Sequence, residues 1–306
     1  MELIDDRLID WQKYLQAPAD AAHVKPASEW CDGVIERMSG GKQIVGAKLP
    51  WFRTHDKIRF RPGETSIWSG VNGHGKSMIQ SHASLGFMGQ GEKVCIASLE
   101  MLPVATMYRM TRQASGGVYP TTDFVKEFHC WTDGRLWLYD QQGRVAADRI
   151  LALGRYLSDE IGITHYVVDS MMKCGIGTDD YNRQKDFVDA LTSLGKDTGM
   201  HIHLVAHSKK GHTEYDQPGK FDVKGASEIT DQVDNVLTAW RNKAKEENPG
   251  GHATEPDALL TVSKQRHGEW EGKIALWFNK ASMTYLEAEN DYPKHYEALS
   301  EGVCKR

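Results

Sequence analysis

A run of eight residues, 70–77, places the strongest constraint on the fold. It reads GVNGHGKS, which satisfies the pattern G-x-x-x-x-G-K-[ST] at every defined position. A short apolar run at 64–69 precedes it, and 76–88 carries apolar residues with a helical period. A strand, a glycine-rich turn and a helix in this order suit phosphate binding, because the N–H groups of the turn and the positive end of the helix converge.

The residue types of this phosphate loop fit that chemistry. Its glycines let the backbone curl around phosphate oxygens, Lys76 is expected to reach the β- and γ-phosphates, and Ser77 offers a hydroxyl to Mg²⁺. A dinucleotide-binding turn is the alternative, but Met78 stands where its last glycine belongs. We assign nine residues to nucleotide binding: Gly70, Val71, Asn72, Gly73, His74, Gly75, Lys76, Ser77 and Met78.

Three polar residues follow apolar strands and become candidates for the same site. Asp169 ends YVVD and is predicted to hold the Mg²⁺ shell together with Ser77. Glu100 ends CIASLE, where a carboxylate can orient the attacking water, and His207 follows HIHLVA, where it can sense the γ-phosphate. The alternatives are a strand-end cap for Asp169, a solvated surface acid for Glu100 and an ordinary strand-end histidine for His207.

Short β-rich runs alternate with amphipathic stretches from about residue 46 onward, which predicts an α/β fold with a mostly parallel sheet covered on both faces. The last three predicted strands follow one another directly and predict an antiparallel extension at one edge. The predicted strands are 64–69, 93–99, 163–169, 201–206, 233–240, 257–264, 272–278 and 282–287, and the predicted helices are 76–88, 103–115, 145–160 and 182–198.

The ends of the chain and one internal segment have a different character. Residues 2–16 carry Ile4, Leu8, Trp11 and Leu15 at helical spacing, and a linker with a short helix near 28–38 follows. The charged, Gly- and Pro-rich stretch 243–257 is predicted to be a mobile loop. We therefore expect three parts: an N-terminal helix and linker at 1–45, an ATPase domain at 46–290 and a C-terminal tail at 291–306.

The composition limits which partners, nucleic acid or membrane, the protein can bind. The 306 residues include 37 Lys and Arg against 42 Asp and Glu, a net charge of −5, so any contact with nucleic acid needs a local basic patch. No run reaches the ~20 apolar residues that span a bilayer, and the start has no basic segment typical of a secretory signal. We expect a cytoplasmic protein, or one of the host cytoplasm if phage-encoded, with no membrane partner.

Four segments in order resemble the motor domain of DnaB-type, RecA-like hexameric replicative helicases, in a phage-like form without primase. They are GVNGHGKS at 70–77, SLEM at 98–101, VVDS at 167–170 and SKQRHGEWEGKIALWF at 263–278. The resemblance covers about 46–290. One departure is His207, which replaces the glutamine found at the sensor position in many cellular members.

The resemblance implies an ATP-dependent replicative DNA helicase with a RecA-like phosphate-loop NTPase fold. Such proteins form ring-shaped hexamers, translocate on single-stranded DNA and hydrolyse ATP with Mg²⁺ at subunit interfaces. It makes Glu100 the catalytic base and Asp169 the Walker B acid. Lys264 and Arg266 would act in trans on a neighbour's ATP, Arg266 as the arginine finger. A separate primase or loader is a possible partner.

The resemblance also points to DNA contacts in the stretch 207–224 and just beyond it. Charge alone favours a solvated loop there, because four lysines face three acidic residues. The match to the family's DNA loop favours contacts to the phosphate backbone, which are salt-sensitive. The candidates are Lys209, Lys210, Lys220, Lys224 and Gly225.

Two other functions remain open at the level of sequence. One is a RecA-like DNA-binding ATPase that acts in recombination or repair without unwinding. The other is a small-molecule kinase, which would require an arginine-rich lid that the sequence does not show.

Overall fold

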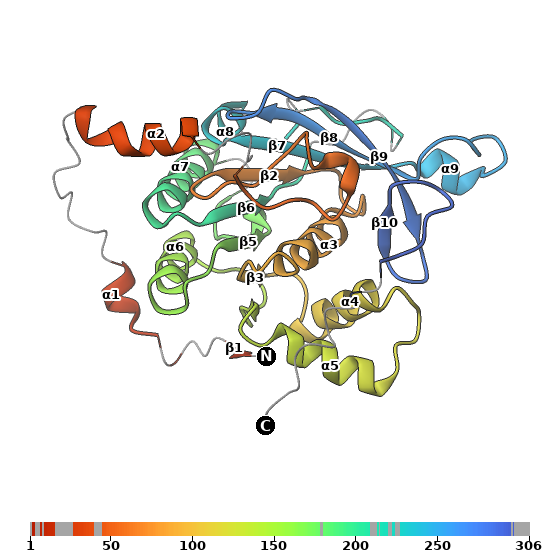
Figure 1. The fold of residues 1–306 in the computed structure, drawn as a ribbon, viewed down its shortest axis with the longest axis horizontal. Helices are drawn as coiled ribbons and strands as arrows, with labels where there is room; N and C mark the ends of the chain where they lie inside the picture. Colours follow the sequence, from red (N-terminus) through yellow and green to blue (C-terminus); the bar gives the residue numbers. More distant parts are fainter. Residues whose placement is uncertain are drawn as a thin grey trace.

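A ten-stranded mixed sheet forms the centre of the protein in the computed structural model (Figure 1). Its order is β1-β4-β3-β5-β6-β2-β7-β8-β9-β10. The strands are β1 (Glu2–Leu3), β2 (Thr65–Ser69), β3 (Val94–Ser98), β4 (Leu136–Leu138), β5 (His165–Asp169), β6 (His201–Val205), β7 (Asn235–Arg241), β8 (Ala258–Gln265), β9 (Gly272–Asn279) and β10 (Thr284–Leu286). The structure describes residues 2–3, 7, 9–15, 27–39, 45–177, 180–208, 213, 215–219, 222–223, 227–294 and 296.

The sheet changes from parallel to antiparallel at β7. All pairs from β1 to β7 are parallel, whereas β7–β8, β8–β9 and β9–β10 are antiparallel. The parallel strands β2, β3, β5 and β6 are buried along their whole length, as expected for strands covered on both faces. The predicted fold class, with its antiparallel C-terminal strands, is confirmed.

Helices cover both faces and divide the apolar interior into two clusters. One cluster joins the sheet to α6 (Ala147–Tyr156) and α7 (Tyr181–Thr198). The other joins it to α3 (Lys76–Met88), α4 (Pro103–Ser115) and α5 (Thr122–Thr132). The shorter helices are α1 (Trp11–Leu15), α2 (Cys31–Ser39), α8 (Ser227–Gln232) and α9 (Lys243–Glu247), and a π-helical turn at Leu157–Ile161 follows α6. Among the described helices, none is long and apolar enough to cross a membrane.

The predicted helix at 2–16 is wrong in extent. Its first described residues form β1, which pairs with β4, and the α-helix α1 begins only at Trp11. The buried side chains there are Ile9 and Tyr14, whereas Leu15 is 47% exposed. The reason is tertiary: the Tyr14 hydroxyl donates to Glu160, and its ring packs edge-on against Tyr156 with centroids 5.7 Å apart. Ile4 and Leu8 lie outside the described residues.

The predicted loop at 243–257 contains a helix. Asn242 caps α9, because its side-chain oxygen accepts the Lys245 N–H at 3.1 Å. Ion pairs then hold the segment, such as Lys245 to Asp257 at 3.0 Å. The Lys245–Asp257 pair joins residues twelve positions apart, and composition alone does not reveal such a contact.

Candidate nucleotide-binding site

The phosphate loop connects the end of β2 to the start of α3, as predicted. Gly70, Gly73 and Gly75 all have positive φ angles, of 151°, 80° and 81°. A Cβ on Gly70 would lie 2.5 Å from the carbonyl oxygen of Ala239 on β7, so only glycine fits between the two strands. The backbone geometry therefore requires the glycines, independently of any ligand.

Lys76 turns back into the loop. Its ammonium donates to the carbonyl oxygens of Gly70 at 2.8 Å and Val71 at 3.1 Å. Burial lowers the pKa of this side chain, and the nearby Asp169 and Glu100 oppose the shift. A triphosphate would offer the ammonium charged oxygens in place of two neutral carbonyls, so the residue is well placed for phosphate binding.

Ser77 and Asp169 form the predicted pair of Mg²⁺-site residues. The Ser77 hydroxyl donates to Asp169 Oδ2 at 2.6 Å, across 92 positions of sequence. Burial raises the pKa of the Asp169 carboxyl, and this hydrogen bond partly offsets the rise. One hydroxyl and one carboxylate suit Mg²⁺, which typically binds few protein oxygens and completes its shell with phosphates and water. The donor set therefore fits the ion.

Glu100 lies two residues beyond β3, beside the metal-site pair. Its Oε1 accepts the Ser170 hydroxyl at 2.9 Å and is 3.9 Å from His207 Nε2. The Glu100 side chain is 41% exposed, against 15% for His207. A half-exposed carboxylate that is fixed by one hydroxyl can accept a proton from a water molecule in the pocket.

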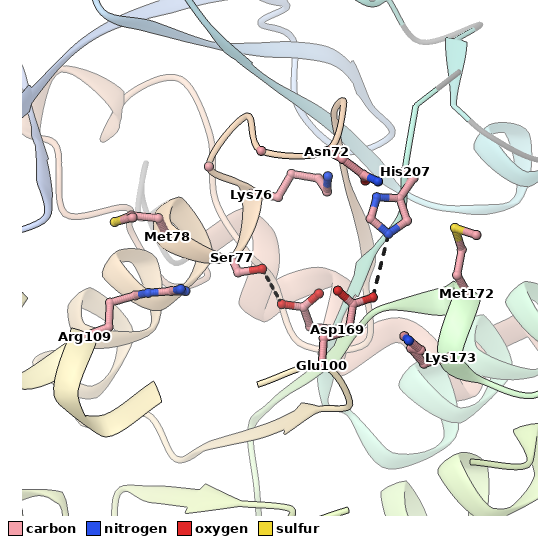
Figure 2. A pocket seen from close by; sticks show the side chains of 12 residues that line it. Asn72, Lys76, Ser77, Met78, Glu100, Arg109, Asp169, Met172, Lys173 and His207 are labelled. Atoms are coloured by element: carbon pink, nitrogen blue, oxygen red, sulfur yellow. Dashed lines mark hydrogen bonds and ion pairs between the residues drawn. The ribbon is translucent and has the colours of Figure 1, made fainter. Parts of the chain in front are cut away.

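These side chains converge on one pocket of about 680 Å³ at the carboxyl ends of the parallel strands (Figure 2). This is the edge at which open α/β sheets bind ligands. Nine predicted residues line it: Asn72, Gly73, Gly75, Lys76, Ser77, Met78, Glu100, Asp169 and His207.

Three residues of the predicted loop are not among those lining the pocket. Gly70 packs against β7, and Val71 contributes a carbonyl to Lys76. His74 is 1% exposed, and its Nδ1 accepts the backbone N–H of Arg241 at 3.2 Å. His74 therefore secures the loop to β7 by its side chain rather than lining the pocket.

Sequence reasoning missed three residues that line the pocket: Arg109, Met172 and Lys173. Arg109 comes from α4, on the side of Ser77 opposite His207 (Figure 2), and burial lowers the pKa of its guanidinium. Met172 and Lys173 belong to a short 3-10 turn, Met171–Lys173, that follows β5. For Met172 and Lys173 the available signal was positional, because a turn that follows a parallel strand begins at the ligand-binding edge.

Lys264 and Arg266 are not among the pocket-lining residues. They lie at the end of β8, beside the C-terminus of α8. Lys264 Nζ donates to the carbonyl oxygens of Thr230 at 2.8 Å and Asp231 at 2.9 Å. The five predicted DNA contacts, Lys209, Lys210, Lys220, Lys224 and Gly225, lie outside the described residues.

Comparisons with known proteins agree with this arrangement at the level of fold. No family model matches the sequence. A solved structure described as the ATPase domain of G40P superposes with a TM-score of 0.73 over 87% of this chain and 100% of that chain, at 13% sequence identity. The chain has the fold of a DnaB-like helicase ATPase domain.

A second solved structure supports the same conclusion. It is described as a DnaB-like replicative helicase and its interactions with primase, and it matches with a TM-score of 0.69 at 12% identity. The match covers 87% of this chain and 68% of that chain. With identities this low, the likeness to the DnaB-like ATPase domain is one of fold.

Proposed function

We propose that this protein is an ATP-dependent replicative DNA helicase, with a RecA-like motor at residues 46–290. One observation carries the proposal: the pocket gathers Lys76, Ser77, Asp169 and Glu100, whereas Arg266 is not among its lining residues. A pocket with phosphate, metal and base residues suits ATP hydrolysis, and Arg266, which lies outside it, is proposed to act from an adjacent copy. The DnaB-like fold adds support.

Binding of the substrate would begin at the phosphate loop. The loop N–H groups and Lys76 hold the β- and γ-phosphates, and Ser77 and Asp169 hold Mg²⁺. When bound, Mg²⁺ would offset the negative charge of the phosphates. The Ser77 hydroxyl donates to Asp169 at 2.6 Å, so the two oxygens are close enough to bind one ion together.

Hydrolysis would then depend on Glu100. Its carboxylate would orient a water molecule toward the γ-phosphorus and accept the water proton as the new P–O bond forms, while the bond to the β,γ-bridging oxygen breaks and ADP leaves. The Ser170 hydroxyl fixes one carboxylate oxygen, and His207 Nε2 lies 3.9 Å from the same oxygen. His207 also lines the pocket, where it would sense the terminal phosphate. Arg266 of an adjacent copy would offset charge that develops on the transferred group.

Assembly and DNA binding follow from the need for a second copy. A hexameric ring repeats each seam, and single-stranded DNA in its channel would meet Lys209, Lys210, Lys220, Lys224 and Gly225 of every copy. Repetition of a small patch explains how a chain of net charge −5 holds DNA. A separate primase or loader is the proposed protein partner.

Three measurements test the proposal. Native mass spectrometry with ATP and single-stranded DNA should show a closed oligomer. Single-stranded DNA should stimulate ATP hydrolysis, and a forked duplex should be opened on one of its two polarities. DNA-stimulated hydrolysis without strand displacement would favour the DNA-binding ATPase of recombination or repair. Full turnover by an isolated monomer would contradict hydrolysis at a seam.

A further inference from the structure

The surroundings of Arg266 assign a role to a residue outside the nucleotide pocket. Arg266 follows β8, and its side chain is 38% exposed. Its Nη2 donates to the carbonyl oxygens of Asp231 at 3.0 Å and Gln232 at 3.3 Å, at the C-terminus of α8. Its Nη1 lies 3.4 Å from Asp234 Oδ1. Three acceptors on one side therefore define the direction of a long, flexible side chain.

Asp234 is the charged member of this set and is almost fully buried, at 2% exposure. Its second oxygen, Oδ2, accepts the N–H of Thr65 at 2.8 Å, where β2 begins. The backbone adds two contacts, because Asp234 donates to Thr65 and accepts from Arg266, at 2.9 and 2.8 Å. The carboxylate is therefore fixed to the strand that leads into the phosphate loop.

These contacts leave part of the guanidinium available. An arginine has five N–H donors in a rigid fork, and the three acceptors occupy one portion of it. The exposed remainder can meet a phosphate without release of the anchors. A guanidinium held in this way loses less conformational freedom on binding than a free one, which favours pre-organised catalysis.

We propose that Asp234 is a positioning residue for Arg266, which it holds with the carbonyl groups of α8 in the orientation that meets the triphosphate of an adjacent copy. The inference rests on the proposed function, because it takes Arg266 to act in trans. The proposal also makes α8 part of the structure that orients Arg266.

The test uses Asp234→Asn in the full-length chain. The amide oxygen of asparagine can still accept the Thr65 N–H, so the substitution removes mainly the charge that faces Arg266. We expect DNA-stimulated turnover to fall by roughly 10- to 100-fold, as for a misplaced catalytic group, with unchanged ATP affinity and assembly. Asp197→Asn, at an exposed position of α7, is the matched control and should leave turnover unchanged.

Assemblies that mix two variants distinguish a role of Asp234 through Arg266 from a role of Asp234 in the nucleotide pocket of its own copy. If Asp234 acts through Arg266, a mixture of Asp234→Asn with Glu100→Gln restores hydrolysis. At some seams of the mixture, the intact pocket of an Asp234→Asn copy meets the intact Arg266 of a Glu100→Gln copy. Mixing Asp234→Asn with Arg266→Ala then restores nothing. The opposite pattern, rescue by Arg266→Ala and not by Glu100→Gln, would overturn the inference and place the defect in the cis pocket.

Two further results complete the design. The reference mixture of Arg266→Ala with Glu100→Gln must recover activity, and its failure would count against hydrolysis in trans rather than against Asp234 alone. Should Asp234→Asn not fold, Asp234→Glu retains the charge with one added methylene and goes through the same mixtures. A smaller loss with the same rescue pattern supports the inference, and normal turnover of both variants overturns it.

Discussion

The two ends of β5 and β6 place polar side chains in opposite surroundings. At the carboxyl ends, Asp169 and His207 line an open pocket. His165 and His201 begin the two strands and His203 lies at the middle of β6, and all three are buried, at 3%, 1% and 0% exposure. The same strands therefore carry polar groups turned toward a possible ligand at one end and toward one another at the other.

The buried histidines form chains of hydrogen bonds. Trp68 Nε1 donates to His203 Nδ1 at 3.1 Å, and His203 Nε2 lies 3.0 Å from His165 Nδ1. His201 Nδ1 lies 2.7 Å from the Arg61 carbonyl, so it must carry the proton, and its Nε2 accepts from Ser66 at 2.8 Å. Buried polar groups that hydrogen-bond to one another in this way favour a single packing arrangement of the core. The polar groups of the pocket can still form hydrogen bonds to a substrate. The contrast predicts that pocket substitutions impair function and histidine substitutions impair stability.

The largest effect is expected from Lys76→Ala. Loss of the ammonium should lower kcat/KM for ATP hydrolysis by about 10³-fold or more, because ground-state and transition-state contacts to phosphate both disappear. Fluorescent-nucleotide binding and steady-state hydrolysis measure it, and Lys126→Ala, exposed on α5, is the control. Normal turnover of Lys76→Ala would show that the nucleotide site lies elsewhere.

Glu100→Gln should lower kcat by about 10²–10³-fold while ATP still binds, because the base is lost and the phosphate contacts stay. Single-turnover hydrolysis and equilibrium binding separate the two quantities. Glu127→Gln, exposed on α5, is the matched control. An equal loss of binding and turnover would assign Glu100 a structural rather than a chemical role.

At the opposite end, His203→Leu should lower the free energy of unfolding by about 2–4 kcal/mol, since Trp68 and His165 each lose a buried partner. Its ATP affinity, measured where the variant is folded, should equal that of the unaltered protein. Urea unfolding measures the loss, and His267→Leu at an exposed position is the control. Weaker ATP binding with unchanged stability would reverse the roles of the two ends.

A fall in pH should lower the free energy of unfolding gradually, and this is the most gradual of the expected effects. Burial lowers the pKa of His201 to about 3, against an unfolded value of about 6.5. A lowered pKa in the folded state means that the unfolded state binds the proton first, so stability is complete above pH ~6.5 and declines as the pH falls toward 3. Between these two pH values, His201 changes the free energy of unfolding by about 1.4 kcal/mol per pH unit. The raised pKa of Asp169 has the opposite sign and offsets part of it.

Urea unfolding between pH 7 and pH 5 measures this dependence. His165 and His203, whose pKa values burial also lowers, should steepen it. A free energy of unfolding that stays constant over this interval would contradict the neutral, buried state of the three rings.

The sequence predicted the elements whose signals are local. The range of α4 was predicted without error, because Pro103 suits the first turn and Gly116 ends the helix with a φ of 67°. The buried parallel strands were predicted from short apolar runs within them, such as the one in β3. By contrast, β4 has only three residues, too few for a period, and the position of α1 depends on Tyr14 and its contact with Glu160, which no local pattern reveals.

The same division applies to the site. The phosphate loop is a contiguous motif, and Asp169 and Glu100 end recognisable strands, so all of them were predictable. Arg109 is one of two basic residues on an amphipathic helix, and only the packing of α4 against α3 brings it into the pocket. Asp234 was missed for a similar reason, since its partners Thr65 and Arg266 lie 169 and 32 positions away.

The contact between Gly75 and Tyr285 has a consequence for the order in which the chain matures. A Cβ at Gly75 would collide with the Tyr285 hydroxyl, so the last strand of the sheet lies directly against the phosphate loop. The Tyr285 carbonyl also accepts the indole N–H of Trp51 at 2.7 Å. During synthesis, the ribosome adds some two hundred further residues after the phosphate loop before Tyr285 emerges. A nascent chain that is truncated before Tyr285 would therefore bind nucleotide poorly.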